Sequence, residues 1–304
     1  IQSVILEAAI AYSQHYKNKK TSVLNENNKA VLKALLDVAK ARSKFGEVSE
    51  TDVFQARSRY AGAVADEIKS QGDFFISKTK FESIFGIKAD GLVEPSPLKI
   101  QYIDVEALLN ATTPNNLKLI NLRKLKKAAD NNVQKLKRDL LPTVDFTSDY
   151  TKGIEVANQF SVSNSAKFKV SLSVPLYSGG IKYSKIRQAR HIAEKAGDDY
   201  DQALKDTKLE VLQAWFNYKT AQSQIKALEE AVSSSKIALN SIRKEADVGS
   251  RAFVEVLDAE QQLLESNASL LDAKNQLVSA TYQINQLTGR LIPGEMDFSM
   301  ADFG

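Results

Sequence analysis

The sequence around residue 249 reads Asp247-Val248-Gly249-Ser250, and around residue 46 it reads Lys44-Phe45-Gly46-Glu47. The two stretches lie 203 residues apart, as Gly46 and Gly249 do. Each follows a long block without proline and precedes a new run of periodic apolar residues. A glycine just past a helix, followed by a short polar stretch, is typical of a helix end and a turn. Each stretch therefore predicts the turn of an antiparallel helical hairpin.

The match continues on both sides of the turns, so that residues 1–86 and 204–290 form two copies of one helical unit without a gap. All six prolines lie outside residues 1–86 and 181–290. An interior proline costs a helix ~3 kcal/mol, so these blocks indicate very long helices. The second copy is preceded by a stretch at 117–203 that has no counterpart before the first. We therefore expect the chain to begin within its first repeat.

Apolar residues along both blocks recur at intervals of seven, as they do in coiled coils. One column precedes the first turn and two adjacent columns follow the second: Leu24, Val31, Val38 and Phe45, then Val256, Leu263, Leu270, Leu277 and Ile284 beside Leu257, Leu264, Leu271 and Val278. Two columns make a stripe wider than a two-stranded coiled coil needs. A helix with a neighbour on each side, as in a ring, would use both.

Two segments between the helical blocks alternate apolar and polar residues, which is the period of a β-strand. Residues 143–151 place Val144, Phe146 and Tyr150 on one face, and residues 167–176 alternate more regularly. Each is about the 9–11 residues that a tilted strand needs to cross a bilayer. A soluble hairpin with one buried face gives the same pattern and is the commoner case. One strand pair cannot close a barrel, so a membrane position requires oligomerisation.

The composition, with 43% hydrophobic and 26% charged residues, is that of a folded protein. The chain lacks cysteine, which excludes disulfides, cysteine catalysis and thiolate metal sites. His15 and His191 have no spaced ligands and are expected at helix-surface or boundary positions. The sequence shows no nucleophile–base pair, phosphate loop or metal cluster. We predict no enzyme, no cofactor and no metal site.

A basic stretch runs from Lys118 to Arg138, and a nucleic-acid partner is one interpretation of it. On a helix these cations wrap several faces instead of forming one stripe, which favours a solvated surface. The net charge of +4 is also mild. We therefore predict no nucleic-acid partner.

Three motifs together resemble the TolC-type outer-membrane channel family, in particular its type I secretion branch. The most specific runs from Val174 to Gly180 and is similar to the junction at which that family turns a barrel strand into a tunnel helix. Residues 45–57 and 249–259 are similar to the two inter-helix turns at the family's periplasmic tip. The resemblance covers essentially the whole chain but lacks the family's amino-terminal quarter or more.

The resemblance implies a mainly α protein with a small β part. Long antiparallel coiled-coil hairpins would form an α-barrel tunnel, and a strand pair would contribute to a trimeric transmembrane β-barrel. The implied segments are a first-repeat hairpin at 1–86, an equatorial linker at 87–116, a helix leading to the membrane at 117–142, a β-hairpin at 143–176, a second-repeat hairpin at 177–290 and a tail at 291–304.

The resemblance also implies a function, namely the passive exit duct of a tripartite efflux or type I secretion system. The duct would lie in the bacterial outer membrane, with its helical tunnel in the periplasm. Implied partners are further copies of the chain in a homotrimer, a periplasmic adaptor (membrane fusion protein), an inner-membrane ABC or RND transporter, and outer-membrane lipid. A soluble coiled-coil scaffold, or the adaptor itself, is the alternative, although no lipoyl-like or β-barrel module of an adaptor is apparent.

Motif by motif, the resemblance assigns roles to residues of the turns and of the strand–helix junction. Glu255 and Asp258 would form an acidic pore constriction, and Arg251 with Asp52 the link that holds the tip closed. Without the resemblance, exposed charges near a turn are the favoured interpretation of Glu255 and Asp258. The residues assigned to adaptor contact are Phe45, Gly46, Glu47, Val248, Gly249 and Ser250, and those of the junction are Pro175, Gly179 and Gly180.

Overall fold

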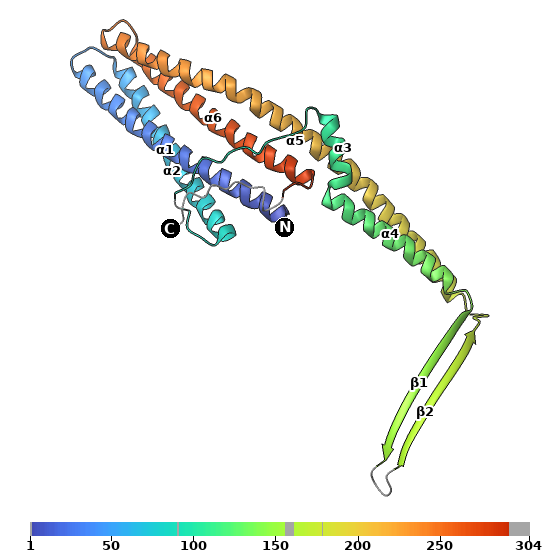
Figure 1. Cartoon of the computed structure of the whole chain (residues 1–304). Coiled ribbons are helices and arrows are strands. Elements are labelled where there is room, and N and C mark those ends of the chain that lie inside the picture. The colour runs from blue at the N-terminus through green and yellow to red at the C-terminus, as the bar shows by residue number, and fades with distance from the viewer. Residues whose placement is uncertain (1, 90, 156–160, 178, 292–304) are drawn as a thin grey trace. The chain divides into compact units, whose positions relative to one another are not determined.

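The computed structural model describes residues 2–89, 91–155, 161–177 and 179–291 (Figure 1). The elements in chain order are α1 (Gln2–Lys44), α2 (Glu50–Phe85), α3 (Val105–Asn115), α4 (Leu117–Arg138), β1 (Thr143–Glu155), β2 (Ser161–Ser173), α5 (Ile181–Asp247) and α6 (Phe253–Leu287). They pack as two compact units, and the second consists of Leu117–Asp206. The predicted architecture of long helical hairpins with one antiparallel strand pair is confirmed.

The first unit contains two antiparallel hairpins, α1 with α2 and the later part of α5 with α6 (Figure 1). The repeat seen in the sequence sets their ends. Helices α1 and α5 end at Lys44 and Asp247, and α2 and α6 begin at Glu50 and Phe253, each pair 203 residues apart. Helix α6 also packs against α1, so the two hairpins lie side by side.

Helix α6 uses both of its predicted apolar columns. Val278 belongs to a buried cluster with Ala9 of α1, whereas Ile284 packs in another with Trp215 of α5. Near the turns, Leu257 joins a third cluster formed by α1 and α2. The helix therefore holds a neighbour on each side, as the width of its stripe predicted.

The column predicted on α1 is not its buried face, and this corrects the heptad assignment there. Val38 and Phe45 are 42% and 82% exposed. The buried residues near the turn are instead Leu32, Leu36 and Ala39. Because α1 faces both α2 and α6, its buried positions spread over two sides and do not follow one seven-residue column.

The linker expected at 87–116 contains a helix that the sequence analysis did not predict, α3. Asp104 caps its start by accepting a hydrogen bond from Ala107 N at 2.7 Å. Leu108 is fully buried against α5. Pro114 lies inside the last turn, so dividing the chain at its prolines hid this helix.

The second unit carries the strand pair, in which Thr143 lies opposite Ser173 and Glu155 opposite Ser161. The predicted strands, 143–151 and 167–176, are extended at the hairpin end and shortened before Pro175, whose nitrogen has no proton for the ladder. None of the described helices combines the length and the hydropathy that a bilayer crossing requires. The predicted tail at 291–304 lies, beyond residue 291, outside the described residues.

His15 is fully buried between α1 and α2, which corrects its predicted surface or boundary position. Its Nδ1 lies 3.0 Å from Ser77 Oγ, and its ring stacks on Phe74. Ser77 Oγ donates to Phe74 O at 2.8 Å, so the proton between His15 and Ser77 belongs to Nδ1. The His15 Nε2 atom is then a buried acceptor with no protein partner among the described residues. Burial, followed by Lys19 and Lys78, lowers the pKa of His15, against a smaller opposite effect of Glu82.

We expect His15 to make the first unit acid-sensitive. Burial disfavours the protonated imidazole in the folded chain and so lowers its pKa, whereas the unfolded chain binds a proton near the ordinary pKa of about 6.5. The free energy of unfolding should therefore fall as the pH drops below about 6.5, by at most about 1.4 kcal/mol per pH unit. Chemical unfolding of wild type and of His15→Asn, compared at several pH values, measures this slope.

The matched control for this prediction is His191→Asn, because His191 is exposed and bonded to Glu194. The slope should persist in His191→Asn and disappear in His15→Asn. An equal slope in wild type and His15→Asn would contradict the role assigned to His15.

Candidate functional site: the turn end of the hairpins

Both hairpin turns end their first helix with the same backbone motif. In each, two carbonyl oxygens of the last helical turn accept backbone N–H groups from residues beyond the helix, at N–O distances of 2.9–3.2 Å. In the first turn, Arg42 O accepts Glu47 N and Ser43 O accepts Gly46 N. In the second, Glu245 O accepts Ser250 N and Ala246 O accepts Gly249 N. This motif needs one residue in the left-handed region, which Gly46 (φ 74°) and Gly249 (φ 79°) provide. The chain thus reverses at equivalent residues of the two repeats.

The six residues predicted to contact an adaptor are all exposed. Phe45 and Val248, which are equivalent in the repeat, are 82% and 80% exposed although both are apolar. Each stands directly before the glycine of its turn. Each turn therefore presents one large apolar side chain to solvent at an equivalent position.

The second helix of each hairpin starts with a carboxylate at its third position. Ser49 Oγ accepts Asp52 N at 3.2 Å, and the Asp52 carboxylate accepts Ser49 N at 3.0 Å. In the second repeat Ala252 has no capping side chain, but the Glu255 carboxylate accepts Ala252 N at 3.3 Å. Asp52 and Glu255 are repeat equivalents, and both place negative charge at the positive end of a helix.

Arg251 is bound by two carboxylates of its own hairpin. Its Nε donates to Glu245 at 2.8 Å and its Nη1 to Glu255 at 2.6 Å. Glu245, followed by Glu255, raises the pKa of Arg251. Arg251, followed by the Ala252 N–H, lowers the pKa of Glu255. Asp52 caps α2 instead, so the Arg251–Asp52 link is not formed within the described part of one chain and stays a prediction for an assembled, closed tip.

Two arginines tie the first hairpin to the second near the turns, and the sequence analysis missed both. Arg59 of α2 donates to Asp258 of α6 at 2.7 Å. Arg42 of α1 donates to Asp247 at 3.1 Å and to Ala246 O at 3.3 Å. The side chains of both ion pairs are 29–73% exposed, so each pair contributes about 0.2–1 kcal/mol at most. The pairs depend on hairpin packing, which the repeat alone does not specify.

Glu255 and Asp258 lie one helical turn apart and line the same shallow groove along α5 and α6. Their side chains are 39% and 58% exposed. Each carboxylate has an arginine partner, Arg251 for Glu255 and Arg59 for Asp258. The groove is therefore acidic but partly compensated. The described residues contain no cluster of acidic or histidine side chains able to hold a metal ion.

The predicted strand–helix junction lies between the end of β2 at Ser173 and the start of α5 at Ile181. Pro175 follows the strand, and Gly179 and Gly180 precede the helix with φ of 59° and 79°. Two consecutive residues in the left-handed region redirect the chain sharply, which glycine permits without steric cost.

A family model described as outer membrane efflux protein matches residues 108–290. The chain is 23% identical over 303 residues to the outer membrane efflux protein BepC of Brucella suis biovar 1, covering 99% of this chain and 66% of that protein. It is 27% identical over 307 residues to the outer membrane protein TolC of Escherichia coli K12, covering 94% and 60%. It is 25% identical over 269 residues to the alkaline protease secretion protein AprF of Pseudomonas aeruginosa, covering 85% and 55%. The chain thus spans about two thirds or less of the length of these relatives.

Solved channel structures share the fold. The outer-membrane channel OprN has a TM-score of 0.79 at 20% identity, with 95% of this chain and 66% of that chain covered. The outer membrane protein VceC of Vibrio cholerae has a TM-score of 0.76 at 18% identity, with 95% and 70% covered. The likeness includes both the helical hairpins and the strand pair.

We expect Gly249→Ala to destabilise the protein by about 1–2 kcal/mol, because alanine is strained in the left-handed region. No atom lies within 4 Å of where a Cβ on Gly249 would stand, so packing should not contribute. Gly62, inside α2, is the matched control, with equally free space but helical backbone. Gly62→Ala should stabilise by about 0.5–1 kcal/mol. Free energies of unfolding measure both, and equal effects would contradict the backbone argument.

Proposed function

Because the chain belongs to the outer membrane efflux protein family, we propose that it is a subunit of a passive, trimeric exit duct in the bacterial outer membrane. Its helical hairpins form a tunnel in the periplasm. The duct serves a tripartite efflux or type I secretion system and is opened at its turn end by a periplasmic adaptor and an inner-membrane ABC or RND transporter. The observation that carries the proposal is a strand pair with an uncovered apolar face, joined to long helical hairpins.

The strand pair has an apolar face but no core to cover it. Val144 lies opposite Leu172, and Phe146 opposite Val170. These four side chains are 66–71% exposed, while the other face carries Ser, Thr, Asp and Lys. Such a pair is unstable in water without a cover, which the hydrocarbon of a bilayer would supply. Each strand has 13 residues, enough for the roughly 9–11 that a tilted crossing needs.

The edges of the strand pair call for further copies of the chain. The described sheet has two strands, so each keeps one unpaired edge. Unpaired backbone groups are not tolerated in lipid, and strands from neighbouring copies would satisfy them. A closed barrel shared among copies is consistent with this requirement.

The contact between the two hairpins within one chain supplies a pattern for the contact between copies. Val278 of α6 is buried with Ala9 of α1. Beside them, Ser13 of α1 donates to Asn275 of α6 at 2.6 Å. In the repeat, α6 is equivalent to α2, and α1 is equivalent to α5. Helix α2 of one copy would therefore pack on α5 of the next.

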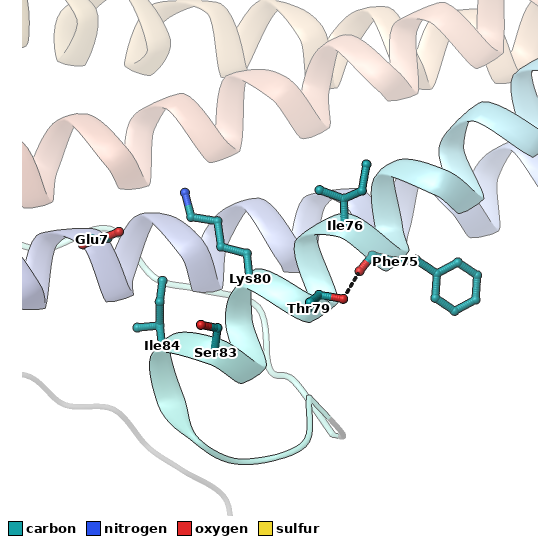
Figure 2. A pocket seen from close by; sticks show the side chains of 7 residues that line it. All are labelled: Glu7, Phe75, Ile76, Thr79, Lys80, Ser83 and Ile84. Atoms are coloured by element: carbon teal, nitrogen blue, oxygen red, sulfur yellow. Dashed lines mark hydrogen bonds between the residues drawn. The ribbon is translucent and has the colours of Figure 1, made fainter.

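The exposed residues of α2 and α5 fit this arrangement. Phe75, the equivalent of Val278, and Phe216, the equivalent of Ser13, are each 60% exposed. Gly72, the equivalent of Asn275, has no atom within 4 Å of its Cβ position and leaves room for a phenylalanine ring. Figure 2 shows Phe75 beside Ile76 at the rim of an open pocket, with its ring turned outward. A head-to-tail contact of this kind gives a ring when its rotation closes, which the proposed trimer requires after three copies.

We expect Phe216→Glu to prevent assembly, because it buries a charge at every α2–α5 contact, at several kcal/mol each. The matched control is Ile237→Glu, since Ile237 is 65% exposed on the same helix and its repeat equivalent, Ala34, is exposed on α1. Light scattering in detergent should give a trimer for wild type and Ile237→Glu, and a smaller species for Phe216→Glu. A Phe216→Glu protein that is still trimeric would refute the α2–α5 contact. A wild-type protein that is monomeric would refute the trimer itself.

At the turn end, we propose that Glu255 and Asp258 of three copies form the pore constriction. Arg251 and Asp52 form the link that keeps it closed. In the single chain Arg251 is bound by Glu245 and Glu255, so making the link would exchange one of these partners for Asp52. The exposed tips that include Phe45 and Val248 contact the adaptor.

We expect multivalent cations to block the pore, because carboxylates around a narrow axis act in a poorly screened space. Glu255→Gln with Asp258→Asn should weaken the block about tenfold or more. Arg59→Gln, which frees Asp258 from its partner, should strengthen it. Planar-bilayer recordings measure the block. An unchanged block in the double variant would place these residues away from the pore, and a wild type without conductance would contradict the channel.

A further inference from the structure

The second unit carries a cluster of cations to which the proposed duct gives no role. They lie in the last turn of α4, which precedes the start of β1, and in the first turns of α5, which follows the end of β2. We name this cluster the basic collar, and its members are Lys135, Lys137, Arg138, Lys182, Lys185, Arg187 and Arg190. All are exposed except Lys182, which is half-buried and donates to Asp139 O at 2.7 Å.

The charge of the basic collar is only partly compensated. Asp139 is the one carboxylate in the segments 131–142 and 179–193. The groove that contains Lys137 and Arg190 is also lined by Asp130, Glu194, Asp198 and Asp201, but among the described residues no collar cation takes part in an ion pair. The seven cations outnumber these five carboxylates, so the collar keeps a net positive charge.

Helix stability explains only part of where these cations stand. Lys135, Lys137 and Arg138 occupy the last turn of α4, where the helix dipole favours cations. Lys182 stands in the first turn of α5, where the dipole disfavours a cation, and Lys185, Arg187 and Arg190 lie beyond that turn, where the dipole has little effect. Further along, residues 194–206 contain five carboxylates and two lysines. The start of α5 is thus basic and the following turns are acidic, a pattern that the dipole does not account for.

Exposed apolar and aromatic side chains adjoin the basic collar on the side of the strands. Leu141 (59% exposed), Leu176 (92%) and Tyr177 (91%) belong to the segments that join strands and helices, and Ile181 (61%) and Tyr183 (60%) to the first turn of α5. Aromatic side chains at headgroup level, with Lys and Arg reaching the phosphates, are the arrangement found at a bilayer surface.

One face of the second unit combines both features. Tyr183, Arg187 and Arg190 follow each other at helical spacing on one side of α5. Lys137 of α4 lines the same groove as Arg190. This face therefore presents an aromatic ring toward the strands and three cations behind it.

We propose that the basic collar binds the phosphates of anionic phospholipids at the surface of the membrane that the strand pair enters. The proposal rests on the proposed function, because it takes the strand pair as the membrane-crossing part. Each cation near an anionic surface strengthens binding about fivefold. A duplex nucleic acid would use the cations but not the exposed apolar and aromatic side chains beside them, so lipid is the better match.

Flotation with vesicles tests the proposal on the whole chain. Vesicles of phosphatidylcholine alone are compared with vesicles that also contain phosphatidylglycerol. Phosphatidylglycerol should increase binding of wild type, and added salt should reduce that gain. The collar variant Lys137→Gln/Arg187→Gln/Arg190→Gln should bind the anionic vesicles roughly 100-fold more weakly. All three residues are exposed, so circular dichroism should show unchanged helix content.

The matched control removes the same charge from the part of α4 away from the strands, as Lys118→Gln/Lys124→Gln/Lys127→Gln. These lysines are also exposed. The control should bind anionic vesicles as wild type does. An equal loss in both variants would mean that only total charge matters, and would overturn the collar.

The remaining outcomes separate the collar from the proposed function. If wild type and the collar variant bind both kinds of vesicle equally, the collar is overturned while the membrane position of the strand pair stands. If the chain binds neither kind of vesicle, the result overturns both the membrane position of the strand pair and the role of the collar. If phosphatidylglycerol gives no gain but a short DNA duplex is bound and the collar variant loses it, the cations serve nucleic acid and the lipid proposal is overturned.

Discussion

The first unit depends on one packing constraint, which is that α6 holds a neighbour on each side. Val278 faces α1 and Ile284 faces α5, so α6 has little apolar surface left for a further partner. By the repeat, α2 has the same two-sided demand. Among the described residues α1 covers one side of α2 along its length, and α6 meets α2 near the turns, through Leu257 and the Arg59–Asp258 pair. Phe75 and Phe216 are both exposed in the single chain, and the proposed contact between copies would cover them. A hairpin pair with one unsatisfied side at each end is the minimal unit of a ring of helices.

The acidic residues of the turn end already stabilise the helix starts within a single chain, whether or not a pore is formed. Asp52 and Glu255 occupy the same third position of equivalent helices, and each accepts a backbone N–H that the helix cannot satisfy itself. Arg251 then bridges Glu245 and Glu255 across the second turn. Charges that line a constriction would thus be held in place by the same bonds that start the helix. On the proposed function, opening such a tip would change exposed ion pairs, each of small energy, and would leave the buried clusters intact.

Local rules predicted much of this fold from the sequence, and the misses share one cause. The absence of proline from residues 1–86 and 181–290 predicted the long helices, and Gly46 and Gly249 predicted the turns. Both effects act within one turn of backbone, so they can be read from local sequence. Burial depends on which helix lies opposite, so the sequence predicted a surface or boundary position for His15 and the wrong buried face for α1. The ties of Arg42 and Arg59 to α5 and α6 were missed for the same reason. Helix α3 was missed because the chain was divided at its prolines, whereas α3 includes Pro114 one residue before its end.

The surfaces that each unit leaves unpaired differ in chemistry, and that difference indicates the kind of partner. The first unit exposes large apolar side chains beside Gly72, a gap that suits another helix. The second exposes an apolar strand face, then tyrosines such as Tyr177 and Tyr183, then cations that form no ion pair among the described residues. A protein partner would leave those cations in need of carboxylates that fit their positions. A bilayer surface supplies hydrocarbon, headgroups and phosphate in that same order, and it needs no specific fit. The order of the side chains along the second unit is therefore better matched by lipid than by a second protein.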